Sequence, residues 1–121
     1  MLLFIMHELS IAISLVEIAE EEAERLGGKV IAVHLKLGPM AGVVKDALLF
    51  SYEIACQETA LEGSRLVIED TPLIVFCPQC RTNRVLGSPQ LLRCFECGTP
   101  TPEVVGGREL QMVAMEVEDA A

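Results

Sequence analysis

The stretch CPQCRTNRVLGSPQLLRCFECG, residues 77–98, decides how the second half of this chain folds. It holds two Cys-x-x-Cys pairs, Cys77 with Cys80 and Cys94 with Cys97, separated by thirteen residues. Each pair forms a tight turn that aims two thiolates at one point, and two such turns complete the tetrahedral site that zinc prefers. Because four thiolates leave no open coordination position, the spacing predicts a structural rather than a catalytic zinc.

The cysteine pairs have three other interpretations: a redox dithiol, a rubredoxin-like iron site and two disulfides. A redox Cys-x-x-Cys opens a helix inside a βαβ unit, and no helical period surrounds these pairs. Iron fits the same four ligands and stays open as an alternative. The fifth cysteine, Cys56, lies among apolar neighbours and is expected to be a buried structural thiol.

No segment of the sequence predicts export or membrane insertion. Residues 1–5, MLLFI, are apolar, but a basic start, a longer apolar core and a cleavage site are missing. No stretch approaches the roughly 18 to 20 apolar residues of a membrane span. We therefore expect a cytoplasmic protein, in which paired cysteines serve as metal or redox sites rather than structural disulfides.

Periodicity predicts an α/β fold around the cysteine segment. Residues 9–26 carry apolar side chains at helical spacing up to Gly27-Gly28, and residues 29–37 alternate as a strand. In that strand one face is expected to carry Ile31, Val33, Leu35 and Leu37. The remaining expected elements are a loop at 38–42, a helix at 45–58, a strand at 65–69 and a strand at 109–118.

These elements predict a small sheet with two helices and an inserted, zinc-ribbon-like four-cysteine module. The last strand is expected to return to the first sheet, because it is too long and apolar to serve the cysteine module alone. The predicted domains are an α/β domain, residues 1–72 and 107–121, and a zinc-binding domain, residues 73–106.

The charge balance disfavours nucleic-acid binding. Eighteen acidic residues against nine basic ones give a formal net charge of −9, and no basic run occurs. A nucleic-acid binder needs clustered Lys and Arg to displace phosphate counterions. No nucleophile–base pair or carboxylate dyad stands out either, so we predict a protein that is not an enzyme.

The two histidines have different settings. His34 falls in the middle of the predicted strand and is expected to be an ordinary sheet residue. His7 falls in MHELS, residues 6–10, just ahead of the predicted first helix. An imidazole beside accessible backbone amides can hold Ni(II) or Cu(II) in square-planar geometry, although the same pattern also suits a solvated helix start.

Several motifs in matching order resemble the HypA/HybF family. They are MHELS at 6–10, Gly38, Gly42-Val43, the paired cysteines and GREL at 107–110. The resemblance runs from Met6 to about Glu118. It implies a nickel metallochaperone for [NiFe]-hydrogenase maturation, a role that some members extend to urease. It also implies a nickel-binding α/β domain that carries a zinc domain between its strands.

The resemblance carries over specific ligands and partners. Nickel (Ni2+) would be held by His7 and Glu8 with nearby backbone nitrogens and, if Met6 is the first residue, its amine. Zinc (Zn2+) would be held by Cys77, Cys80, Cys94 and Cys97. The expected partners are a HypB-type GTPase, the [NiFe]-hydrogenase large subunit and, as in some relatives, urease maturation proteins. We expect a monomer, with a dimer as the alternative.

Two departures from the family pattern limit these expectations. Five residues precede Met6, so a chain that starts at Met1 offers no free amine at the nickel site and should bind nickel more weakly. Arg81 and Gly98 stand where some relatives have a histidine beside a zinc cysteine, which argues against pH sensing there. The rival interpretation is a zinc-ribbon adaptor that only binds proteins.

Overall fold

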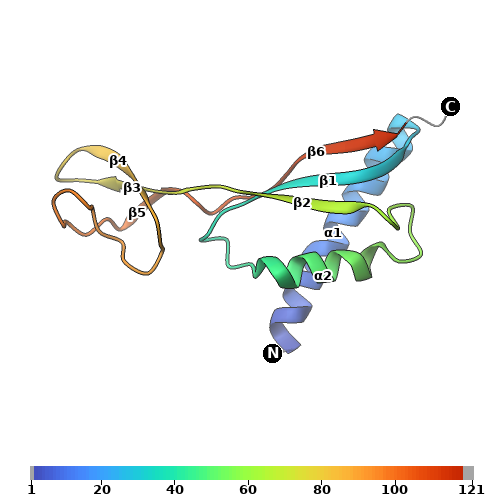
Figure 1. Cartoon of the computed structure of the whole chain (residues 1–121), viewed down its shortest axis with the longest axis horizontal. Coiled ribbons are helices and arrows are strands. Elements are labelled where there is room, and N and C mark those ends of the chain that lie inside the picture. Colours follow the sequence, from blue (N-terminus) through green and yellow to red (C-terminus); the bar gives the residue numbers. More distant parts are fainter. Residues whose placement is uncertain (1, 119–121) are drawn as a thin grey trace. The chain divides into compact units, whose positions relative to one another are not determined.

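The computed structural model describes residues 2–118, with side chains described from His7 onward. Its elements, labelled in Figure 1, are α1 (Leu2–Leu26), β1 (Lys29–Leu37), α2 (Lys45–Cys56), β2 (Arg65–Asp70), β3 (Leu73–Cys77), β4 (Thr82–Leu86), β5 (Glu103–Gly106) and β6 (Leu110–Glu118). The mixed α/β class is therefore confirmed. None of the described helices has both the length and the apolar character needed to cross a membrane.

Within residues 2–118 the strands form two sheets of three strands each. One has the order β2-β1-β6 and the other the order β4-β3-β5. In Figure 1 the red strand β6 lies beside β1, although the whole cysteine segment separates them in sequence. This arrangement confirms that the last strand returns to the first sheet.

The chain divides into two compact units. The first contains the chain up to Leu35, Val43–Ile68 and the chain from Met112; the second contains Lys36–Gly42 and Glu69–Gln111. The main hydrophobic core belongs wholly to the first unit. Its buried members are Ala12, Leu15, Val16, Ala19, Ala23, Val30, Val33, Leu35, Leu48, Tyr52, Cys56, Leu61 and Leu66.

Helix α1 begins earlier than the sequence predicted. It starts at Leu2 rather than near residue 9, so the expectation that His7 lies ahead of the helix was wrong. Residues 2–8 are mostly strong helix formers without Gly or Pro, so nothing stops the helical period from extending backwards. At the other end Gly27 adopts φ 76° and its N–H bonds the Ala23 carbonyl at 2.8 Å, as expected for a glycine C-terminus.

In the second unit, the loop after β1 is held by the segment before β6. The Gly38 N–H donates to the Glu109 carbonyl at 2.8 Å, and the Met40 N–H donates to the Gly107 carbonyl at 2.7 Å. The Glu109 carboxylate accepts hydrogen bonds from the Thr71 hydroxyl and the Gly107 N–H, both at 2.8 Å. Gly38, Gly107 and Glu109 therefore have a structural role. We call the Gly107–Glu109 segment, which holds the loop after β1, the clasp.

Candidate metal centres

The second unit brings four cysteine sulfurs together. Cys77 ends β3, Cys80 lies in the turn to β4, and Cys94 and Cys97 lie in the segment between β4 and β5. Their four Sγ atoms all lie within 4.8 Å of one another. The two Cys-x-x-Cys pairs thus form one cluster, although the whole of β4 separates them in sequence.

The two cysteine turns are closed in the same way. The Arg81 N–H donates to the Cys77 carbonyl at 2.8 Å, and the Gly98 N–H donates to the Cys94 carbonyl at 2.9 Å. Both donors have left-handed backbones, with φ 56° at Arg81 and 74° at Gly98. Each turn thereby folds back on its own first cysteine, which points both of its thiols to one side.

The sulfur spacing fits a tetrahedral metal ion. The Sγ–Sγ distances are 3.5 Å between Cys77 and Cys97 and 4.0 Å between Cys80 and Cys94. A tetrahedron with Zn–S bonds of about 2.3 Å has edges of about 3.8 Å. A disulfide needs an S–S distance near 2.05 Å, and the five cysteines of this structure are all free thiols.

The free thiols of the cluster differ in acidity. Hydrogen bonds from the Cys97 and Glu96 backbone N–H groups lower the pKa of Cys94 to about 6. The Arg84 guanidinium favours the Cys80 thiolate, but hydrogen bonding with the Cys97 thiol and burial outweigh it and raise the pKa of Cys80 to about 11. A bound metal must displace the protons that such thiols retain, so metal binding would release protons.

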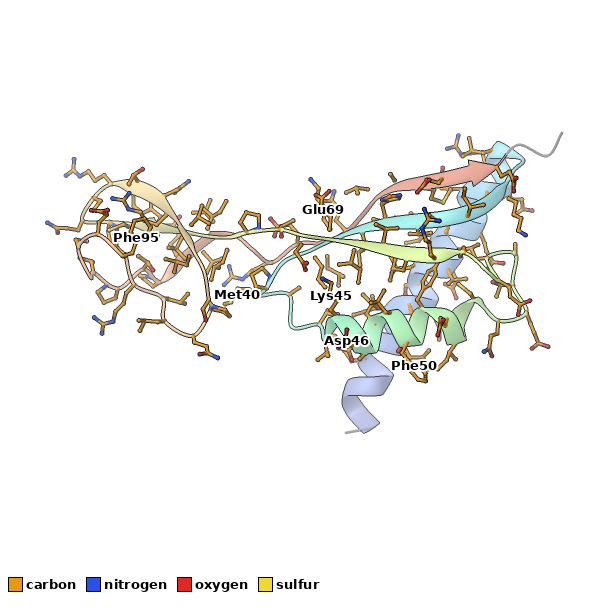
Figure 2. All side chains as sticks on the ribbon, in the orientation of Figure 1. Met40, Lys45, Asp46, Phe50, Glu69 and Phe95 are labelled. Carbon is orange, nitrogen blue, oxygen red and sulfur yellow. The ribbon has the colours of Figure 1, made fainter. Side chains whose placement is uncertain are left out.

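Arg84 is a charged neighbour of this cluster that the sequence did not single out. It lies on β4, and its Cζ atom is 5.2 Å from the centre of the Phe95 ring, labelled in Figure 2. Hydrogen bonding with the Cys80 and Cys94 sulfurs raises the pKa of the guanidinium. No local sequence signal marks it, because its position depends on how β4 pairs with β3.

The first unit contains the other predicted metal residues, His7 and Glu8. The His7 side chain is 54% exposed, whereas Glu8 is fully buried. Glu8 Oε2 accepts a hydrogen bond from the Val44 N–H at 2.9 Å and lies 3.8 Å from His7 Nδ1. Glu8 Oε1 is buried and has no hydrogen-bond partner among the described side chains and backbone. A buried carboxylate oxygen without a partner is costly, and a cation beside it would offset that cost.

The backbone at this site is less accessible than the sequence suggested. In a helix that begins at Leu2, the N–H groups of His7 and Glu8 lie beyond the four that lack intrahelical acceptors. Their use as metal ligands would require the first turns of α1 to open. The Met6 side chain lies outside the described part of the chain.

Two other residues behave as predicted. His34 lies in β1, and its Nε2 is 2.7 Å from Glu116 Oε2, which also lies 3.4 Å from Arg65 Nη2. It is therefore a sheet residue in a surface charge network. Cys56 is 3% exposed and belongs to the hydrophobic core, which confirms the buried thiol.

Comparison with known proteins places these features in a family. A family model described as "Hydrogenase/urease nickel incorporation, metallochaperone, hypA" matches residues 6–117. A hydrogenase maturation factor HypA of Chloroflexus aurantiacus is 49% identical over 112 residues, covering 92% of this chain and 98% of the relative. One of Roseiflexus sp. is 50% identical over 115 residues, covering 94% of each chain.

Two solved structures share the fold. The solution structure of the Ni metallochaperone HypA from Helicobacter pylori has a TM-score of 0.64 at 20% identity and covers 93% of this chain and 97% of its own. A second HypA solution structure has a TM-score of 0.69 at 22% identity with the same coverage. On the family match and the identity to these relatives, the chain belongs to the HypA family of metallochaperones for nickel incorporation into hydrogenase and urease.

Proposed function

We propose that this chain carries Ni(II) to the maturation of [NiFe]-hydrogenase and uses the four-cysteine cluster as a structural zinc site. The observation that carries the proposal is that each of the two units contains a different kind of metal donor. Four sulfurs gather within 4.8 Å of one another and would fill a tetrahedral ion completely. The His7–Glu8 pair belongs to the first unit and combines an exposed imidazole with a buried carboxylate. The four-cysteine site, which leaves no coordination position free, suits a permanently bound ion. The His7–Glu8 site supplies few side-chain ligands and suits an ion that must be released.

Cargo binding at His7 is favoured over binding at His34. The His34 imidazole already contacts the Glu116 carboxylate, which also faces the Arg65 guanidinium. A cation there would have to compete with this arginine. At His7 the neighbouring carboxylate has one buried oxygen without a partner in the described structure, and the imidazole is exposed. Imidazole is a ligand that suits nickel.

The proposed nickel ligands are His7 and Glu8 with nearby backbone nitrogens and, in a chain that begins at Met6, the Met6 amine. Such a chain would place the His7 and Glu8 N–H groups among the first four of its helix, which have no intrahelical acceptor. Their deprotonation would then cost no helical hydrogen bond. A chain that begins at Met1 has to open its first turns, so it should bind nickel more weakly.

We assign the cargo site to a nickel-binding domain of residues 1–72 and 107–121, and the zinc ligands Cys77, Cys80, Cys94 and Cys97 to residues 73–106. The proposed partners are a HypB-type GTPase, the hydrogenase large subunit and urease maturation proteins. The role proposed is carriage of a metal by a monomer, without catalysis. The description of the matching family as metallochaperones supports it.

Nickel titration of two purified versions of the chain, beginning at Met1 and at Met6, tests the proposal. Each version is also prepared as His7→Ala and as the matched control His34→Ala, and bound zinc and nickel are quantified. We expect one zinc in every version, one nickel in the Met6 form, its loss in His7→Ala and its retention in His34→Ala. If neither version binds nickel, or if His34→Ala removes it, the assignment of the cargo site fails. Retained zinc would then leave a zinc-stabilised protein adaptor.

A further inference from the structure

We infer that Arg84 is a positioning residue for the four-cysteine site, where its guanidinium, held over the Phe95 ring, offsets the charge of the thiolates and slows loss of the metal. This inference rests on the proposed zinc site. It adds to that site a residue that contacts no metal and that the cysteine spacing does not reveal.

The strand register places Arg84 on the cysteine face of the hairpin. β3 and β4 pair antiparallel, with Cys77 opposite Thr82 and Val75 opposite Arg84. Directly opposed residues share one face of an antiparallel pair, and so do residues two apart on one strand. Arg84 therefore projects to the same side of the sheet as the Cys77 sulfur.

Phe95 fixes the guanidinium from the second cysteine turn. The ring comes from the residue between Cys94 and Glu96, and its centre is 5.2 Å from Arg84 Cζ, within cation–π range. The Arg84 Nε is buried and has no hydrogen-bond partner among the described residues. The Nε atom is therefore shielded from solvent, while the residue as a whole is half-buried.

The net charge of the metal-bound four-cysteine site explains why a neighbouring guanidinium would stabilise it. Four thiolates around one divalent ion carry a net charge of about −2. Cys77 and Cys94 are buried, so water stabilises that charge poorly. A guanidinium on the cysteine face of the hairpin stabilises the thiolates as a group, and its positive charge reduces their readiness to leave the metal or to attack an electrophile.

The test compares full-length chains purified with zinc bound. The variants are Arg84→Gln, which removes the charge; Arg84→Lys, which keeps it; and Phe95→Leu, which removes the ring. Arg81→Gln is the control, because it removes the same charge from an exposed side chain in the first cysteine turn. The measurements are zinc content, the rate of zinc transfer to a chromogenic chelator, and the rate of alkylation of the cysteines by iodoacetamide. The thiolate-to-metal charge-transfer band of the Co(II)-substituted proteins adds a spectroscopic signature.

We expect all variants to retain one zinc, and Arg84→Gln to raise both rates about tenfold, the scale on which neighbours of metal ligands act. Its charge-transfer band should move to lower energy, because uncompensated thiolates are better electron donors. Arg84→Lys should recover much of the effect, Phe95→Leu should fall between, and Arg81→Gln should match the parent chain. Equal rates in Arg84→Gln and the parent chain, with one zinc in each, would overturn the role of Arg84 alone. A parent chain without cysteine-bound zinc would overturn the proposed zinc site and this inference together.

Discussion

The carboxylate of Glu8 on α1 accepts a hydrogen bond at 2.9 Å from the backbone N–H of Val44, the residue that precedes the first turn of α2. Glu8 extends the buried stripe of α1 by one turn beyond Ala12, so its side chain is shielded from solvent, although Val44 is half-exposed. A negative charge at a helix N-terminus also interacts favourably with the helix dipole. One residue of the predicted nickel site therefore also joins the two helices.

Replacing Glu8 with Ala should lower the free energy of unfolding by about 1 to 3 kcal/mol, because the Val44 N–H loses its only acceptor in the described structure. Glu8→Gln keeps an acceptor oxygen and should lose less. Urea unfolding of the three proteins, followed by helical circular dichroism, measures the difference. Equal stability of Glu8→Ala and the parent chain would show that the contact between the helices adds nothing.

Gly38 should not tolerate a side chain. A Cβ on Gly38 would clash with the Gly107 carbonyl group and lie 2.7 Å from Glu109 Oε1, because the loop after β1 passes directly against the clasp before β6. Gly38→Ala should therefore lower stability by about 1 to 3 kcal/mol, the usual cost of overpacking.

Gly87 offers a matched control for this clash. A Cβ there would meet nothing within 4 Å, so Gly87→Ala should change the free energy of unfolding by less than about 0.5 kcal/mol. The comparison needs only thermal or urea unfolding of the two alanine variants. If both variants lose the same stability, the close approach of Gly38 to Gly107 does not exclude a side chain.

The apolar periodicity of a single segment predicted its secondary structure correctly where the observed packing follows the same periodicity. β1 occupies the predicted residues 29–37, and α2 begins at Lys45 as expected, because alternation and an apolar helical run are both encoded within one segment. Burial departs from this alternation at the start of β1, where Val30 is 1% exposed and Ile31 is 37% exposed. Val30 and Val33 both join the core, so the strand does not keep a strict period of two.

The parts of the candidate sites that the sequence did not reveal depend on distant contacts. The four cysteines were recognised because their spacing encodes the turns. Arg84 reaches them only through the β3–β4 register. Glu8 reaches Val44 only after α1 and α2 have packed. Neither contact can be predicted from the periodicity or spacing of residues in the sequence.

Glu116 should make the free energy of unfolding depend on pH in the acidic range. The hydrogen bond with His34, and then the Arg65 charge, lower the pKa of the Glu116 carboxyl in the folded chain. A carboxyl whose folded pKa lies below its unfolded value, about 4.3, stabilises the fold above that value and loses the contribution as the pH falls through the folded pKa. The stability gap between the parent chain and Glu116→Gln should therefore shrink from about pH 5 to about pH 3.

Urea unfolding at several pH values in this range measures the difference in the free energy of unfolding between the parent chain and Glu116→Gln. The titration of groups that both proteins share cancels in this difference. Glu21→Gln, which changes an exposed carboxylate on α1, is the control and should show a constant small gap. A gap for Glu116→Gln that stays constant or widens as the pH falls would contradict the assignment of the lowered pKa to the His34 contact.

Removing the proposed zinc should loosen the second unit and leave the first intact. The main core, with thirteen buried residues, belongs to the first unit. Apart from its cysteines, the apolar residues buried in the described part of the second unit are Leu37, Leu73 and Val75. A core that small rarely supports a fold without a staple, so we expect β3, β4 and β5 to depend on a metal bound by the sulfurs.

Hydrogen exchange before and after treatment with a strong chelator tests this division. Amides of β3 and β4 should lose protection, whereas those of α2 should keep it and the helical circular dichroism should hold nearly constant. Cys94→Ala should reproduce the chelated state without chelator, because three thiolates cannot complete the tetrahedron. Cys56→Ala, which removes a buried thiol from the first unit, should not mimic chelation. Unchanged protection in β3 after complete metal removal would mean that the strands hold each other without zinc, and the cysteine cluster would then need a role other than a structural one.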